Sequence, residues 1–264
     1  MDQTSDQPPA DPPRSAISCT DLGFRYGRRQ VLRGVTKQFG PGVTGILGPN
    51  GAGKSTLIRC LATALKPSEG ELFFDGISLG ALDRQRVRRV IGYLPQRFSL
   101  MPWATAQRNV AYAAWAQGIA PKACSEAAAE ALRVVGLTRE ASSRVRTLSG
   151  GQQQRVGIAC AIAHSPRVVL LDEPTAGLDA ERRARFKDHL GAIARSTTVI
   201  MSTHIIDDLE GSAHDVLVLT EGVSAFSGRL ENLRDAAGLS DGEKLEVAYI
   251  EVLKTFSSRR MNAA

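Results

Sequence analysis

The sequence has no long apolar run. Its longest unbroken hydrophobic stretch is Val110 to Ala116, whereas a helix that crosses a bilayer needs about 20 apolar residues. The segment Met1 to Arg14 is rich in Pro, Asp and Gln and has no apolar stretch of the kind found in signal peptides. We therefore expect a protein that is made and kept in the cytoplasm, with any membrane crossing left to another polypeptide.

Cysteine and aromatic residues are also scarce. The four cysteines lie far apart and form no CxxC pair, which predicts small buried thiols in their reduced form rather than disulfides or a structural zinc site. Aromatic residues make up 5%, and the arginines behind the formal net charge of +6 are scattered. A nucleic-acid surface more often combines a basic stripe with stacking aromatics. The charge therefore indicates solvated faces, and no nucleic-acid partner is expected.

What the sequence does contain is an alternation of short strands with longer helices from Ile17 onward. The apolar run Val168 to Leu171 is typical of a parallel strand that is covered on both faces. Between Met101 and Ser165 the strand pattern gives way to Ala-rich helical segments at 105–117, 125–135 and 150–164. The predicted strands are 31–39, 43–47, 71–74, 90–93, 168–172, 197–202, 215–219 and 223–227.

This pattern predicts an α/β domain over residues 16–230, with a helical insertion at about 100–165. Residues 1–15 hold four prolines among small polar residues, so we expect a disordered tail there. Residues 231–264 are predicted to form a helical tail, with a terminal helix at about 246–256.

One glycine-rich segment matches the phosphate-binding pattern GxxxxGK[ST]. Its glycines let consecutive backbone N–H groups point inward, a lysine reaches the β- and γ-phosphates, and a serine hydroxyl can bind Mg²⁺. The predicted strand 43–47 precedes it and a helix at 55–65 follows, so the phosphates would lie at a helix N-terminus. The segment comprises Gly48, Pro49, Asn50, Gly51, Ala52, Gly53, Lys54, Ser55 and Thr56.

Two carboxylates end the apolar strand at 168–172. Asp172 and Glu173 would lie at the carboxyl edge of a parallel sheet, where such folds bind ligands. Asp172 is suited to holding Mg²⁺ directly or through water, and Glu173 is suited to acting as general base on an attacking water.

A third motif opens the predicted helix at 150–164. It runs Leu148-Ser149-Gly150-Gly151-Gln152. Its serine is a natural N-cap, and its two glycines allow a phosphate to approach the helix N-terminus closely. Alone, a Ser-Gly-Gly sequence is more often an ordinary turn. Its position between the other motifs favours the functional interpretation.

In this order, the motifs resemble those of the ATP-binding-cassette (ABC) ATPases. The resemblance covers about Ile17 to Gly228 and implies a P-loop NTPase (RecA-like) core with an antiparallel β subdomain and a helical insertion subdomain. It implies that Tyr26 stacks on adenine and that Gln96 contacts Mg²⁺ and the attacking water. It further implies that Asp179 lies in a dimer-contact loop and that His204 contacts the γ-phosphate. Without the resemblance, each of these residues would have a more ordinary structural explanation.

The resemblance also implies a mechanism that needs two chains. In this family two ATPase subunits pack head to tail, with ATP between the glycine-rich Walker A loop of one and the signature motif of the other. Ser149 and Gly151 would thus contact nucleotide held by the Lys54 of the second subunit, which is either an identical or a different chain. Glu173 would assist hydrolysis, which releases the dimer. The implied cofactors are ATP and Mg²⁺, with Ser55, Gln96 and Asp172 as metal ligands.

The resemblance further implies that this ATPase is a motor, which would drive a separate integral-membrane subunit from the inner face of the cell membrane. Segments 91–96, 202–210 and 228–230 are similar to the bacterial drug, lipid and polysaccharide efflux branch, so we expect an exporter. A motor of an importer and a soluble ABC ATPase acting on ribosomes or DNA remain alternatives. Gly177, Ala106 and Arg108 depart from common family residues; the latter two lie where the membrane subunit normally docks and leave its identity open.

Overall fold

The structure of the chain is a computed structural model that describes residues 16–80, 84–240 and 242–261. Within these residues the strands form a four-stranded sheet of order β2-β1-β4-β5 and a six-stranded sheet of order β10-β9-β3-β8-β7-β6. The strands are β1 (Ile17–Tyr26), β2 (Arg29–Phe39), β3 (Gly42–Leu47), β4 (Glu69–Phe74), β5 (Ile77–Ser78), β6 (Ile91–Leu94), β7 (Val168–Asp172), β8 (Thr198–Thr203), β9 (Asp215–Thr220) and β10 (Val223–Arg229). The predicted tail 1–15 lies outside the described residues.

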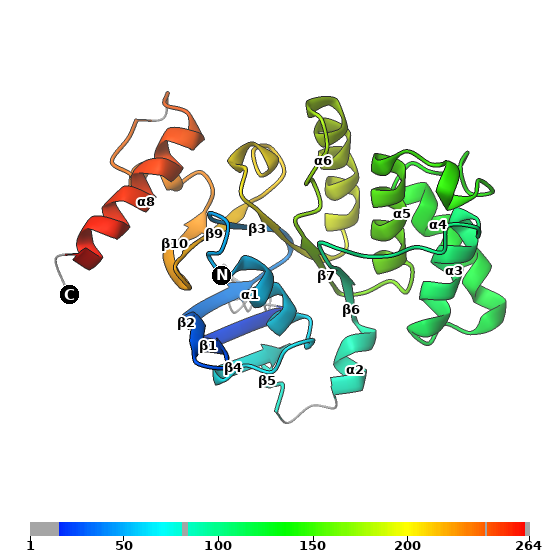
Figure 1. Cartoon of the computed structure of the whole chain (residues 1–264), viewed down its shortest axis with the longest axis horizontal. Coiled ribbons are helices and arrows are strands. Elements are labelled where there is room, and N and C mark those ends of the chain that lie inside the picture. Colours follow the sequence, from blue (N-terminus) through cyan, green and yellow to red (C-terminus); the bar gives the residue numbers. More distant parts are fainter. Residues whose placement is uncertain (1–15, 81–83, 241, 262–264) are drawn as a thin grey trace, which may run out of the picture.

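Helices cover both faces of the larger sheet and extend beyond both of its ends (Figure 1). They are α1 (Lys54–Leu61), α2 (Arg84–Arg89), α3 (Ala106–Ala116), α4 (Cys124–Val134), α5 (Gly150–Ile162), α6 (Ala180–Ala194), α7 (Leu233–Ala236) and α8 (Leu245–Met261). Short 3₁₀ turns occur at Pro121–Ala123, Val145–Thr147 and Ile206–Asp208. Among the described helices, none is both long and apolar enough to cross a membrane.

The larger sheet separates two hydrophobic cores. Val168 and Leu170 of β7 belong to the core that α1 forms with the smaller sheet, whereas Val169 and Leu171 belong to the core on the opposite side. This alternation confirms the prediction that the continuous apolar run is a strand buried on both faces. Strands β3, β6, β7, β8 and β9 pair in parallel. The loops that follow them therefore gather at one edge of the sheet.

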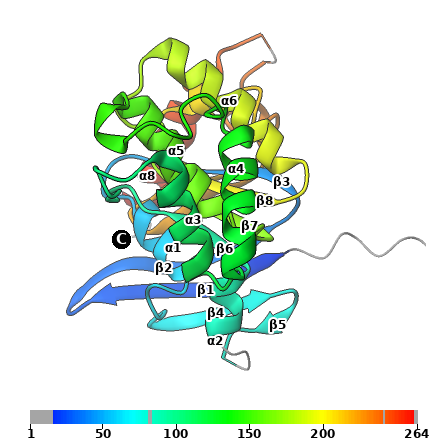
Figure 2. The same ribbon diagram turned by 90° about the vertical axis from the view of Figure 1, so that its right-hand side faces the viewer.

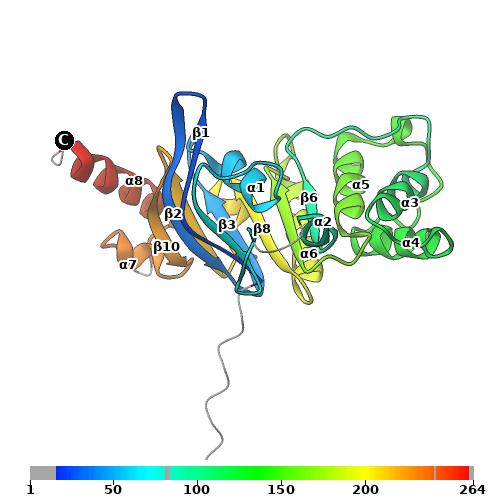
Figure 3. The ribbon, with the colours of Figure 1, turned by 90° about the horizontal axis from the view of Figure 1, so that it is seen from below.

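Helices α3, α4 and α5, which lie between β6 and β7 in the sequence, pack against one another. They form the green end of the molecule in Figures 1 and 3, opposite α8, and Figure 2 views the chain from their side. The three helices predicted in this stretch are confirmed to within two residues at each end. The predicted terminal helix at 246–256 is also present, within the longer α8.

Two local expectations differ from the structure. The helix after the glycine-rich loop, predicted to reach residue 65, ends at Leu61 because Thr63 adopts a left-handed backbone with φ of +58°. Of the cysteines, Cys19, Cys60 and Cys124 are buried, whereas Cys160 is half-buried. Desolvation raises the pKa of Cys60 and of Cys160 to about 12, which favours the protonated, unreactive thiol.

Candidate active site

The glycine-rich loop lies between β3 and α1, at the edge of the sheet where the parallel strands end. A Cβ atom on Gly48 would collide with the carbonyl oxygen of Leu219, and Gly53 has a φ of +104° just before the helix. Glycine is therefore needed at both positions. The Lys54 Nζ donates hydrogen bonds to the carbonyl oxygens of Gly48 (2.7 Å) and Pro49 (3.2 Å). The loop thus folds around its own lysine, at the N-terminus of α1.

A hydrogen-bond network joins this loop to the ends of β7 and β8. Ser55 Oγ donates to Asp172 Oδ1 over 2.9 Å, and Ser202 Oγ donates to the same oxygen over 2.7 Å. Ser202 Oγ in turn accepts the backbone N–H of Glu173 over 2.8 Å. Asp172 Oδ2 is buried and has no hydrogen-bond partner among the described residues. A buried, unpartnered carboxylate oxygen beside a serine hydroxyl fits a hard cation such as Mg²⁺, which prefers oxygen ligands.

The Glu173 carboxylate is held at both oxygens. Its Oε1 lies 3.2 Å from Lys54 Nζ, and its Oε2 lies 2.8 Å from His204 Nδ1. The side chains of Lys54 and Glu173 are only 5% and 7% exposed. Glu173 has a φ of +51°, an uncommon conformation for a side-chain-bearing residue that is often found at functional sites. This conformation and its two partners direct the carboxylate toward the glycine-rich loop.

An open cleft of about 750 Å³ lies above the loop. It is lined by the predicted residues Tyr26, Asn50, Gly51, Gly53, Lys54, Ser55, Thr56, Gln96 and Glu173, and by Arg29, Val31 and Arg59. Tyr26 is 46% exposed, and its ring makes an edge contact with Phe24 at a centroid distance of 4.8 Å. Ala52, which is buried, and Asp172, which accepts the Ser55 hydroxyl, do not line this cleft.

Three of the cleft residues were not predicted from the sequence: Arg29, Val31 and Arg59. Arg59 follows Ser55 by four positions on α1, a spacing that places two helical side chains on one face. Burial opposes the charge of Arg59, but the hydroxyls of Tyr26 and Tyr93 outweigh it and raise the pKa of the guanidinium. Arg59 is thus a fixed cation at the aromatic end of the cleft. The helical spacing could have indicated it.

The signature motif, Leu148 to Gln152, lies outside this cleft. Ser149 is the N-cap of α5; its hydroxyl accepts the Gln152 N–H over 3.3 Å, and its own N–H donates to the Gln152 side chain over 2.9 Å. Asp179 is the N-cap of α6 and accepts the Arg182 N–H over 2.9 Å. None of the residues Ser149, Gly150, Gly151, Gln152 and Asp179 lines the large cleft. A single chain therefore brings only part of the predicted site together.

A second buried network steadies the loops after β7 and β8. Thr175 Oγ1 donates to Asp208 Oδ2 over 2.6 Å, and Thr203 Oγ1 donates to the same oxygen over 2.8 Å. Asp208 is almost fully buried. The sequence did not indicate this network, because a short polar side chain at a strand end carries no local sign of its partner.

Ser202→Ala is expected to damage the site without touching the cleft. The change removes the acceptor of the buried Glu173 N–H and one donor to Asp172, so the free energy of unfolding should fall by about 1–3 kcal/mol. We also expect ATP hydrolysis to slow about tenfold, because Glu173 loses its positioning. Urea unfolding and a steady-state ATPase assay measure the two effects. The exposed Ser227→Ala is the matched control, and a Ser202 variant that behaves like this control would contradict the role.

Comparison with known proteins agrees with this geometry. Residues 32–176, more than half of the chain, match the family described as ABC transporter. The chain belongs to the ABC transporter family. It is 35% identical over 236 residues to an uncharacterised ABC transporter ATP-binding protein, YxlF, of Bacillus subtilis (strain 168), covering 87% of this chain and 78% of that protein.

Two further relatives carry the names of import proteins. The methionine import ATP-binding protein MetN of Thermobifida fusca (strain YX) is 37% identical, with 84% of this chain and 72% of that protein covered. The aliphatic sulfonates import ATP-binding protein SsuB 1 of Xanthomonas axonopodis pv. citri (strain 306) is 38% identical, with 82% and 86% covered. The relatives are thus similar to this chain over most of its length.

Solved structures show the same fold. An ATP-binding subunit of an ABC transporter superposes with a TM-score of 0.77 at 28% identity, covering 90% of this chain and 99% of that one. A dimeric post-hydrolysis state of the ATP-binding cassette MJ0796, bound to ADP and Pi, superposes with a TM-score of 0.71 at 29% identity, covering 81% and 98%. This ABC protein is an ATP-binding subunit and an ATPase whose hydrolysis is coupled to transport. The expected P-loop NTPase fold is confirmed.

Proposed function

We propose that this chain is the ATP-hydrolysing motor of an ABC importer and works as one of two ATPase subunits on a separate membrane-spanning partner. The observation that carries the ATPase assignment is the cleft in which Lys54, Ser55 and Glu173 meet beside Asp172. The direction of transport rests on the relatives that are named for import. The exporter expected from the segments at 91–96, 202–210 and 228–230 gains no support from these relatives and becomes the alternative.

The side chains in and beside the cleft have distinct tasks in hydrolysis. Lys54 and the N-terminus of α1 bind the phosphates, and Tyr26 offers an exposed ring for the adenine. Ser55, Asp172 and Gln96 would hold Mg²⁺, which when bound neutralises phosphate charge. Glu173 accepts the proton of the attacking water, and His204, in contact with that carboxylate, orients it and faces the γ-phosphate.

A groove beside Gln96 is suited to the membrane partner. It measures about 340 Å³ and lies between the segment after β6 and helices α3 and α5, with Phe98, Met101 and Tyr112 in its lining. Trp103 and Trp115 are exposed near it, at 73% and 54%. Exposed aromatic residues beside an apolar groove are typical of a protein interface. Docking there would place the chain at the inner face of the membrane.

Affinity purification of the tagged chain from solubilised native membranes tests the proposal. We expect a polytopic membrane subunit to co-purify, and we expect ATP hydrolysis by the purified complex in liposomes to rise when an extracellular solute-binding protein and its solute are added. A membrane subunit with no such stimulation would favour the exporter. Recovery of ribosomal proteins or nucleic acid, with no membrane subunit, would overturn the transporter assignment.

A further inference from the structure

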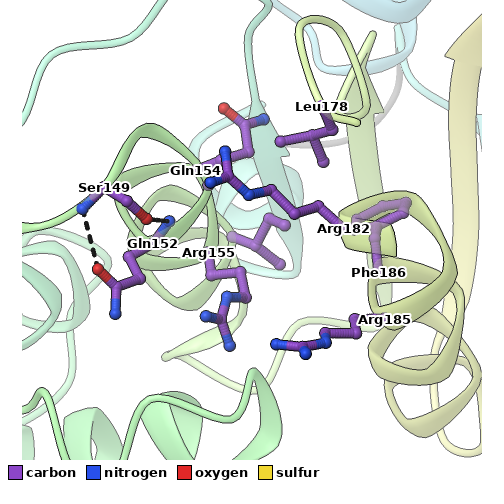
Figure 4. A pocket seen from close by; sticks show the side chains of 10 residues that line it. Ser149, Gln152, Gln154, Arg155, Leu178, Arg182, Arg185 and Phe186 are labelled. Carbon is purple, nitrogen blue, oxygen red and sulfur yellow. Dashed lines mark hydrogen bonds between the residues drawn. The ribbon is translucent and has the colours of Figure 1, made fainter. Parts of the chain in front are cut away.

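Arg182 lies directly over the signature turn, the Gly150-Gly151 part of the signature motif at the start of α5. Its side chain starts on the first turn of α6 and runs toward α5, ending near Gln154 (Figure 4). A Cβ atom on Gly151 would lie 3.3 Å from Arg182 Cδ and 3.8 Å from its Nε. Both residues line a pocket of about 380 Å³ between α5 and α6. The guanidinium and the glycine backbone of the signature turn therefore share one face.

The charge of Arg182 can be redirected to a ligand at small cost. Its Nε lies 3.3 Å from Asp179 Oδ2, in a pair whose side chains are 50% and 59% exposed. Exposed pairs of this kind contribute little to stability, so another anion can compete for the guanidinium. Arginine presents a planar fork of donors that matches phosphate oxygens.

The neighbouring arginines of the same pocket are placed differently. Arg155 donates to the backbone carbonyl oxygens of Val135 and Gly136, which ties it to the end of α4. Arg185 lies about one turn further along α6, where its Nη2 donates to Glu181 over 2.6 Å. Among the three, Arg182 is the one whose stem contacts the signature turn.

Arg182 does not line the nucleotide cleft of its own chain. If two chains pair with the signature turn of each on the cleft of the other, the face that carries Gly151 and Arg182 meets the phosphates bound by the second chain. We propose that Arg182 binds the phosphate groups of the ATP held by the partner subunit, as a positively charged group supplied in trans. This inference rests on the two-subunit arrangement of the proposed function.

ATP-dependent dimer formation tests this role. In a Glu173→Gln background, Arg182→Met should need about 100-fold more protein to form the ATP-bound dimer on gel filtration, because the two-site dimer loses two charge-assisted hydrogen bonds, each worth about tenfold. The ATP affinity of the monomer, titrated at low protein concentration, should stay within about twofold, because each chain keeps its own cleft. Arg182→Lys should recover part of the loss. Arg185 lines the same pocket, so Arg185→Met is the matched control.

The outcomes separate the possibilities. Unchanged dimer formation by Arg182→Met would overturn the inference. So would a fall in the ATP affinity of the monomer as large as that of Lys54→Met, because Arg182 would then act in the cleft of its own chain. Failure of the Glu173→Gln parent itself to dimerise with ATP would overturn the two-subunit mechanism as well.

Mixing two variants in the wild-type Glu173 background tests the trans geometry directly. A Lys54→Ala chain paired with an Arg182→Met chain has one site with an intact cleft and an intact opposing Arg182. We therefore expect the mixture to hydrolyse ATP faster than the sum of the two separate variants, as should a control mixture of Lys54→Ala with Ser149→Arg. A gain in the control mixture without a gain in the Arg182 mixture would overturn the assignment.

Discussion

Glu173→Gln should lower the rate of ATP hydrolysis at saturating MgATP by about 10²–10⁴-fold, the usual effect of removing a general base. The amide keeps the shape of the carboxylate and can still bond His204, but it cannot accept the proton of the attacking water. Nucleotide binding should persist, because the glycine-rich loop and Ser55 are unchanged. The variant should therefore accumulate as an ATP-bound dimer.

Two measurements check this result. A phosphate-release assay gives the rate, and gel filtration with and without MgATP gives the subunit association. The exposed Glu210→Gln serves as control, because it makes the same chemical change away from the cleft. A Glu173→Gln protein that hydrolyses ATP as fast as the control, or stays monomeric in MgATP, contradicts the role assigned to Glu173.

The glycine-rich loop and the carboxylate pair were predictable from the sequence because the residues that carry the chemistry of each motif are neighbours in the chain. Lys54 and Ser55 follow the glycines directly, and Asp172 and Glu173 directly end an apolar strand. Physical reasoning then requires only that parallel strands end at one edge, and the structure joins the two motifs there through a hydrogen bond between Ser55 and Asp172.

Other parts were not predicted, for specific reasons. Strand β1 loses its alternating pattern where its register to β2 shifts between Cys19 and Leu22 and again before Phe24, and a bulged strand gives a weak period-two signal. Helix α6 was not predicted, although Phe186, Leu190 and Ile193 are buried at helical spacing, because three arginines, a lysine and acidic residues dominate its composition. Ser202 acts through Asp172 and Glu173, which are far away in the sequence, so its task emerges only from the fold.

The Lys54→Met variant should bind ATP about 10- to 100-fold more weakly, because a charge-assisted contact to the phosphates is lost. It should also destabilise the nucleotide-free protein, since it leaves the 7%-exposed Glu173 carboxylate without its ammonium partner. Breaking a buried ion pair at one end costs about 3–5 kcal/mol. The contact with His204 keeps our expectation at the lower end, about 3 kcal/mol.

A double variant separates the ion pair from the simple loss of a lysine. Lys54→Met combined with Glu173→Gln removes both charges, so urea unfolding without nucleotide should show a double variant that is more stable than Lys54→Met alone, despite its additional change. Lys66→Met, which alters an exposed lysine beyond the end of α1, controls for the removal of a charge. If the effects of the two single changes simply add, Lys54 and Glu173 do not form an energetically coupled pair. If they couple as expected, then ATP binding, by drawing Lys54 to its phosphates, also frees the Glu173 carboxylate from its cation for catalysis.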